Sequence, residues 1–116
     1  MKKFSLLFLI CSLLWLAPIA AQAYNGNDLA AVRNGRSCPA ADLSHADLSG
    51  FDMTELDLSG ANLKHANLLG ARLEKTNLTG ADLQNANLKR AVFTEAKMAG
   101  ANLQNVTAPY AFFGSA

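Results

Sequence analysis

The chain has 116 residues, of which 51% are hydrophobic and 16% charged, and its formal net charge at pH 7 is +1. This length is typical of one small domain. A charge so close to zero indicates neither nucleic-acid binding nor attachment to an anionic membrane surface, because either would need a basic stripe.

The first predicted element is a leader over residues 1–23. Lys2 and Lys3 precede an apolar run, and residues 21–23 (AQA) have the small-x-small pattern of a cleavage site. The run is shorter than the ~20 residues of a membrane-spanning helix. We therefore expect a secretory signal peptide that is cleaved before Tyr24, rather than an uncleaved anchor, and a periplasmic or secreted mature chain with a net charge of −1.

The second predicted element, over residues 24–40, is an N-terminal capping segment with a short helix. Asn27 or Asp28 is the expected N-cap, and Gly35 is expected to end the helix. Such a helix would plug the open end of the fold that follows, since repeat rods need terminal caps. Leu29 and Val32 are the apolar residues of this helix, and they are predicted to lie over Phe51 or Leu56, the two large first-place residues.

From Ala41 to Asn105 the sequence repeats every five residues, in thirteen consecutive pentads. Neither the period of an α-helix nor that of a flat strand keeps every fifth residue on one side. The first place of each pentad is mostly Ala, and the second, fourth and fifth places are mostly polar. A single pentad cannot bury its own large residue, so the pentads must stack around an apolar axis. The third places are Leu43, Leu48, Met53, Leu58, Leu63, Leu68, Leu73, Leu78, Leu83, Leu88, Phe93, Met98 and Leu103.

This pattern, A-(D/N)-L-x-x, resembles the pentapeptide-repeat family. The resemblance implies an all-β fold, a right-handed quadrilateral β-helix with four pentads to a coil, capped here by the short N-terminal helix. Residues twenty apart are then vertical neighbours, roughly 4.8 Å apart. The exposed fifth places Glu55, Lys75 and Glu95 would stack with alternating charge, whereas three pentads to a coil would place Lys75 on Arg90.

The segment Ser37-Cys38-Pro39-Ala40-Ala41 is similar to an S-C-P-x-C segment of some exported members of the family, with Ala41 in the place of the second cysteine. The missing cysteine removes a C-x-x-C redox or metal site. Cys38 is then the lone cysteine of the mature chain, and we expect either its burial under the cap or an intermolecular disulfide.

His45 and His65 are predicted to lie one coil apart on an outer corner, with Asp47 or Asn67 nearby. Two imidazoles and one oxygen ligand are a set that zinc or copper accepts. Two exposed ligands hold a metal weakly, so we expect ordinary surface side chains and predict no metal site.

The repeat becomes degenerate over residues 106–116. If the pentads continue, Phe113 lies below Phe93, whereas Tyr110 and Phe112 point outward. Aromatic residues at the end of a rod indicate either a hydrophobic cap or the contact of an end-to-end homodimer.

The sequence contains no catalytic constellation and no phosphate-cradling glycine loop, and a coil filled with leucine leaves no pocket. We therefore predict that the protein is not an enzyme and has no catalytic, cofactor-binding or metal-binding residues. The predicted function is an exported structural or interaction scaffold for an unidentified protein or glycan partner, with no nucleic acid and, after cleavage, no membrane. The alternative is a DNA mimic that binds topoisomerase. Export and a near-neutral charge disfavour it, because only the first coil is acidic, through Asp42, Asp47, Asp52 and Asp57.

Overall fold

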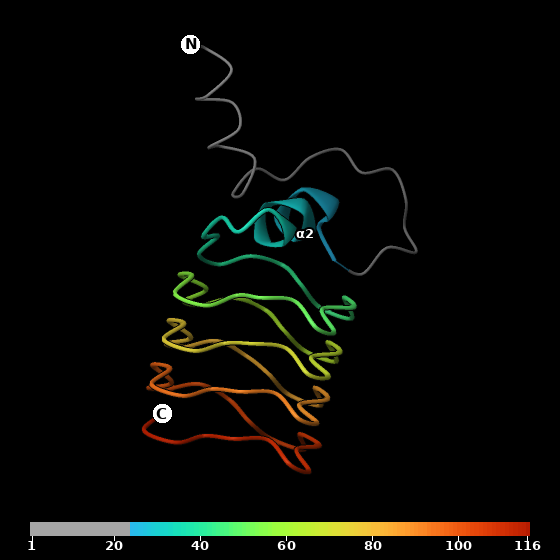
Figure 1. Ribbon diagram of the computed structural model, residues 1–116. Helices are drawn as coiled ribbons and strands as arrows, with labels where there is room; N and C mark the ends of the chain where they lie inside the picture. The colour runs from blue at the N-terminus through green and yellow to red at the C-terminus, as the bar shows by residue number, and fades with distance from the viewer. Residues whose placement is uncertain (1–23) are drawn as a thin grey trace.

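The computed structural model describes residues 24–116, and the predicted signal peptide lies outside the described residues. Within that range the chain forms a stack of coils with the helix α2, Gly26–Arg33, at one end and the C-terminal coil at the other (Figure 1). The β pairing of these residues consists of isolated parallel bridges, without an extended strand. The coils are therefore joined by a ladder of single bridges rather than by a sheet of extended strands, because the chain turns in every pentad.

Each bridge joins the second places of two pentads that lie twenty residues apart, which confirms four pentads to a coil. Leu43 N–H donates to the Asn62 carbonyl (2.8 Å), and Asn62 N–H donates to the Ala41 carbonyl (2.8 Å). The same pattern recurs on every face of the coil. The bridges are Asp42–Asn62, Asp47–Asn67, Asp52–Arg72, Asp57–Asn77, Asn62–Asp82, Asn67–Asn87, Arg72–Val92, Asn77–Lys97, Asp82–Asn102, Asn87–Thr107 and Val92–Phe112.

A tight turn separates each face from the next. In the first pentad, Ala46 N–H donates to the Leu43 carbonyl (3.1 Å), and His45 has φ 62°. A positive φ at the third residue of a turn is typical of type II turns, which favour glycine there. The fifth place of every pentad adopts this conformation, and Gly50, Gly60 and Gly70 occupy it in alternate pentads of the first half.

The axis of the stack is a continuous apolar core. The third-place side chains from Leu43 to Phe93 are fully buried, and first-place alanines such as Ala41 and Ala61 are buried as well. One first place is polar: Thr76 donates its hydroxyl to the Met53 carbonyl (2.7 Å). Among residues 24–116, no buried side-chain nitrogen or oxygen lacks a hydrogen-bond partner.

Helix α2 begins earlier than the sequence predicts. Its N-cap is Asn25, whose side-chain oxygen accepts hydrogen bonds from the backbone N–H groups of Asn27 (2.8 Å) and Asp28 (3.3 Å). The prediction of Asn27 or Asp28 as N-cap is therefore wrong. Asp28 is unsuitable because its carboxylate is turned into the interior, where it is 3% exposed.

The end of α2 and its packing agree with the sequence. Gly35 follows the helix with φ 75°, and its N–H donates to the Val32 carbonyl (2.9 Å). Leu29 and Val32 are buried together with Leu56. The guanidinium carbon of Arg33 lies 5.7 Å from the centroid of the Phe51 ring, so α2 covers the first coil as expected.

The capping segment replaces the groups that a preceding coil would supply. The Asp28 carboxylate accepts the N–H of Asp42 (2.9 Å), and Asn25 N–H donates to the Asp42 carbonyl (2.9 Å). On another face, the hydroxyl of Ser37 accepts the N–H of Asp57 (2.8 Å). The edge of the ladder next to α2 is thus closed by side chains and backbone of the chain itself.

Pentad geometry extends beyond the regular repeat in both directions. Cys38 N–H donates to the Asp57 carbonyl (3.0 Å), and Ala40 has φ 59°, as in any other fifth place. At the other end, Phe113 stacks on Phe93 as predicted, with ring centroids 4.9 Å apart and an interplanar angle of 4°. Phe112 is 56% exposed, which agrees with its predicted outward direction.

Candidate interaction surface

The second-place carboxylates are fixed by their own turns. The Oδ1 atom of Asp47 accepts hydrogen bonds from the hydroxyl (2.7 Å) and the N–H (3.1 Å) of Ser49, and Thr54 donates in the same way to Asp52. Hydrogen bonds of this kind favour the charged form, so the hydroxyl of Ser49 lowers the pKa of Asp47, and that of Thr54 lowers the pKa of Asp52.

The same oxygens also join neighbouring coils. The Nδ2 group of Asn67 donates to Oδ1 of Asp47 (3.2 Å), and Nδ2 of Asn87 donates to Oδ1 of Asn67 (3.2 Å). Much of the polar chemistry of the side faces is therefore used within the ladder. The sequence indicated polar faces turned toward a partner, but it did not show that these side chains bond to one another.

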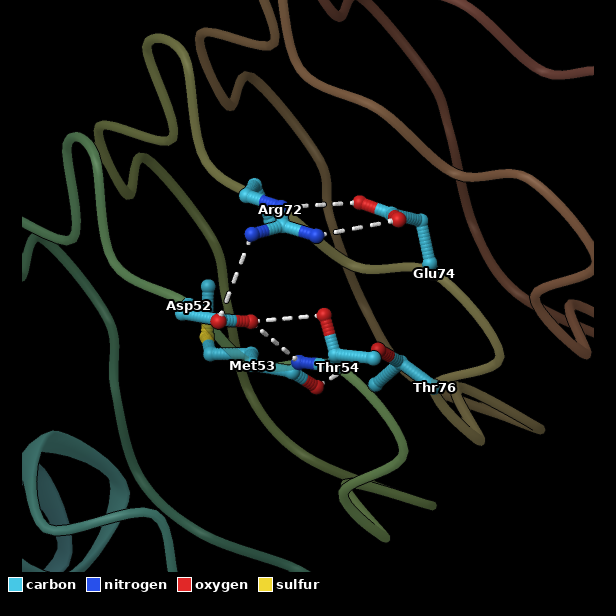
Figure 2. Close-up of polar contacts among 6 residues, drawn as sticks. All are labelled: Asp52, Met53, Thr54, Arg72, Glu74 and Thr76. Atoms are coloured by element: carbon cyan, nitrogen blue, oxygen red, sulfur yellow. Dashed lines mark hydrogen bonds and ion pairs between the residues drawn. The ribbon is translucent and has the colours of Figure 1, made fainter.

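Arg72 joins two carboxylates in a cluster of ion pairs (Figure 2). Its Nε and Nη2 atoms donate to the Glu74 carboxylate (3.0 and 3.2 Å), and Nη1 lies 3.6 Å from Oδ2 of Asp52. All three side chains are solvent-accessible, so solvent screens the pairs and they contribute little to stability. The contacts leave the Arg72 guanidinium compensated by two carboxylates.

The predicted charge column has the predicted register but lacks direct contacts. Glu55 N–H donates to the Glu74 carbonyl, and Lys75 N–H donates to the Thr94 carbonyl, which places Glu55, Lys75 and Glu95 above one another. Within residues 24–116, no ion pair of 4.0 Å or less joins members of this column. Their alternating signs act only through solvent.

His45 and His65 lie on one outer corner with their rings stacked. The ring centroids are 4.6 Å apart, and the interplanar angle is 12°. Coordination of a shared metal requires two nitrogens directed at one point. These parallel rings instead face each other. In the described part of the chain, no three His, Cys, Asp or Glu side chains lie together as metal ligands.

Cys38 occupies the third place of the pentad above Leu58. Its side chain is fully buried, and Sγ lies 3.5 Å from Oδ1 of Asp28. The predicted burial under the cap is confirmed. Cys38 is also disulfide-bonded. The alternative of an intermolecular disulfide stays a prediction.

Large exposed apolar side chains occur in two places. Leu103 and Phe113, both 37% exposed, lie on the axis of the C-terminal coil. Leu69, Tyr110 and Phe112 instead lie on the side of the rod, with exposures of 39%, 81% and 56%. The predicted homodimer contact through the C-terminal end stays a prediction. Tyr110 and Phe112 are exposed, as their predicted outward direction requires. The exposed Leu69 was not singled out from the sequence, although an apolar residue in a polar fourth place was a visible signal.

The repeat itself decides the family. The sequence matches the family described as Pentapeptide repeats, in eight copies, over residues 41–80 and 71–107. The chain belongs to the pentapeptide repeat family. A comparison with curated proteins found no match.

Solved pentapeptide repeat proteins resemble the chain. HetL, involved in heterocyst differentiation regulation in the cyanobacterium Nostoc sp. strain PCC 7120, is 36% identical, with a TM-score of 0.60 over 63% of this chain and 34% of HetL. Rfr23 from the cyanobacterium Cyanothece 51142 is 35% identical, with a TM-score of 0.43 over 61% of this chain and 52% of its own. A protein from the Arabidopsis thaliana thylakoid lumen is 30% identical, with a TM-score of 0.42 over 69% and 63%. The chain thus spans between a third and two thirds of the length of these relatives.

Pentapeptide repeat proteins are generally non-catalytic repeat scaffolds, and the resemblance to HetL implies a right-handed quadrilateral β-helix. Membership of the family therefore establishes a repeat scaffold and leaves the partner open. No helix within residues 24–116 has the length and apolar character needed to cross a membrane.

Proposed function

We propose that this pentapeptide repeat protein is an exported, non-catalytic scaffold, a right-handed quadrilateral β-helix that presents its side faces to a protein or glycan partner. One observation supports this proposal above all others. The axis is filled by fully buried side chains, from Leu43 to Phe93, so that the described residues offer their chemistry on the outer surface. A rod of this kind holds exposed side chains at fixed spacings, which suits recognition rather than catalysis.

The exposed aromatic residues are the part of this surface that best suits a partner. Tyrosine, phenylalanine and arginine are enriched where proteins bind one another. Arg90 lies over the exposed Tyr110 ring, and Phe112 is exposed in the next pentad along the chain. Glycan rings also stack on exposed aromatic faces. Nucleic acid is not proposed, since the side faces lack a basic stripe.

Export is supported by the leader over residues 1–23 and is tested by fractionation. We expect the protein in the extracytoplasmic fraction, with an intact mass that corresponds to a chain beginning at Tyr24. The matched control is Ala23→Arg, which blocks the small-x-small site and should leave the leader attached. A cytoplasmic, uncleaved wild-type protein would refute export and would favour the DNA-mimic alternative.

The end-to-end homodimer predicted from the sequence is tested separately, by native mass spectrometry of the wild type and Leu103→Ser. Leu103 lies at the centre of the C-terminal coil and is 37% exposed. A dimer that this substitution abolishes supports the end-to-end contact. A wild-type monomer at about 100 µM, well above a typical transient dissociation constant, would contradict it.

A further inference from the structure

One corner of the rod carries bulky side chains at one end and only glycine backbone at the other. Its fifth places in four successive coils are Gly50, Gly70, Arg90 and Tyr110. Arg90 lies over the Tyr110 ring, with its guanidinium carbon 5.9 Å from the ring centroid. The corner is therefore flat in the half near α2 and projects in the half near the C-terminal coil. We call this surface the corner strip, and it comprises Asp47, Gly50, Leu69, Gly70, Lys89, Arg90 and Tyr110.

The corner strip also separates charges that form no ion pair with the described residues. Asp47, in the same pentad as Gly50, is exposed, and the hydrogen bonds from Ser49 lower its pKa. Lys89 and Arg90 are exposed in the projecting half. None of these three charged residues belongs to an ion pair among residues 24–116, where the pairs are Lys64–Asp82, Arg72–Asp52 and Arg72–Glu74.

Leu69 lies in the middle of the corner strip, beside Gly70. Its side chain is 39% exposed, whereas its column neighbours above and below are the polar Ser49 and Lys89. On the other side of the corner, the charge of Arg72 is already compensated. An exposed leucine with charges at either end of the strip has the arrangement of a small interface, with an apolar centre and a charged rim.

We propose that two copies of this chain pack side by side and antiparallel along the corner strip, about a two-fold axis that passes close to Gly70. In a two-fold contact the same surface of each copy packs against that of the other, with the two surfaces running in opposite directions. Asp47 and Gly50 lie one coil from Gly70 toward α2, and Lys89 and Arg90 lie one coil away in the other direction, each coil being about 4.8 Å deep. In the pair, Lys89 and Arg90 of each copy face Asp47 of the other copy.

A second copy fits this strip because the strip complements itself in both shape and charge. The projecting Arg90 meets the bare backbone at Gly50, and the two Leu69 side chains meet at the axis. Every contact occurs twice, as an isologous interface requires. The apolar area is small, so we expect a dissociation constant on the order of 10 µM that rises with salt concentration. This pairing does not depend on export or on the partner of the scaffold.

Sedimentation equilibrium of the wild type and of surface variants tests the pairing. We expect Leu69→Asp and Arg90→Asp each to weaken the dimer by at least about tenfold, by removing the apolar centre and the rim charge. The matched control is Lys75→Asp, because Lys75 is also an exposed fifth-place cation, with φ 59° against 60° for Arg90, but lies on another corner. Its dimer should match that of the wild type.

A cysteine pair tests the position of the axis. Gly70→Cys places two thiols near the two-fold axis, whereas Gly60→Cys places them on a different corner. The two sites are otherwise equivalent, with φ 66° and 68°, and an added Cβ meets no atom within 4 Å at either. Mild oxidation should give a covalent dimer with Gly70→Cys. Gly60→Cys should stay at the level of the wild type, whose own cysteines, Cys11 and Cys38, are the same in both variants.

The results that overturn the proposal are distinct from those that concern the scaffold. A wild-type monomer at about 500 µM excludes the pairing, since that concentration is far above the expected dissociation constant. A dimer that Leu103→Ser breaks and Leu69→Asp does not break lies at the C-terminal coil instead. Failure of Gly70→Cys to cross-link a dimer that Leu69→Asp abolishes excludes the axis at Gly70. Unchanged melting temperatures would show that the variants are folded.

Discussion

At the scale of single residues, the backbone conformation of the fifth place governs the whole repeat. It has φ near 60° whether the residue is glycine, as in Gly80, or carries a side chain, as in Lys75 and Glu95. A left-handed conformation costs a residue with a Cβ roughly 1–2 kcal/mol. The ladder bonds on both sides of each turn hold these residues in place at that cost.

Replacement of Gly80 by Ala should therefore lower the free energy of unfolding by about 1 kcal/mol, although an added Cβ meets no atom within 4 Å. The loss arises from backbone strain and not from a clash. Urea denaturation measures it, with the reverse change, Glu95→Gly, as the control that should cost little or nothing. A Gly80→Ala protein as stable as the wild type would contradict the argument.

The second-place carboxylates predict how stability responds to acid. Hydroxyl and backbone donors lower the pKa values of Asp47, Asp52 and Asp57 in the folded chain. The native state then binds fewer protons than the unfolded state, so stability is present above the unfolded pKa, about 3.9, and is lost as pH falls through the lower native values. Urea denaturation at a series of pH values should show this loss.

The control for the acid response is the triple variant Asp47→Asn, Asp52→Asn, Asp57→Asn. Asparagine keeps the acceptor oxygen but does not titrate, so its stability should change less between about pH 4 and pH 2. Asp28 has the opposite effect. Burial raises its pKa in the folded chain, so its contribution to the free energy of unfolding is lost as pH rises. A steeper acid loss in the triple variant would refute the assignment.

At the scale of elements, α2 and its flanks complete the first coil. Asp28 accepts the N–H of Asp42, and Asn25 both caps the helix and donates to the Asp42 carbonyl. A buried N–H without an acceptor costs about 1–3 kcal/mol, and loss of an N-cap costs about 1 kcal/mol. The capping segment therefore contributes through hydrogen bonds as well as through the apolar residues Leu29 and Val32.

Asp28→Ala should destabilise the protein by about 1–3 kcal/mol, because the N–H of Asp42 loses its acceptor. Faster hydrogen exchange at the Asp42 amide should accompany this loss. Asn27→Ala is the matched control, since Asn27 lies in the same turn of α2 and its side chain makes no hydrogen bond with the described residues. Equal exchange rates at Asp42 in both variants would contradict the proposed role of Asp28.

At the scale of the whole molecule, the five-residue period together with the resemblance to pentapeptide-repeat proteins was sufficient to predict the register. Four pentads to a coil placed Phe113 under Phe93 and Glu55 in line with Lys75, because residues twenty apart then share a face. The N-cap and the bonds between neighbouring asparagines were not predictable. They depend on the direction of each polar side chain within the fold. At each site several neighbouring polar residues had equally suitable local sequence patterns, so the sequence did not distinguish between them.

Deletion of residues 61–80 removes one coil and should leave every later residue on its own face. We expect a folded, cooperative protein with a lower melting temperature and a urea m-value reduced by about a fifth, since m follows the surface exposed on unfolding. The control deletion, 61–78, breaks the five-residue phase and should abolish cooperative unfolding. Cooperative unfolding of the control would contradict the importance of that phase.

The closure of the ladder by α2 has a consequence for how such rods coexist at high concentration. Coils that stack on coils are related by a translation, and a contact of that kind propagates without limit into filaments. Growth in that manner needs an exposed edge above Asp42, and the carboxylate of Asp28 already occupies it. A chain whose cap is displaced, for example by Asp28→Ala, is therefore the one we expect to polymerise.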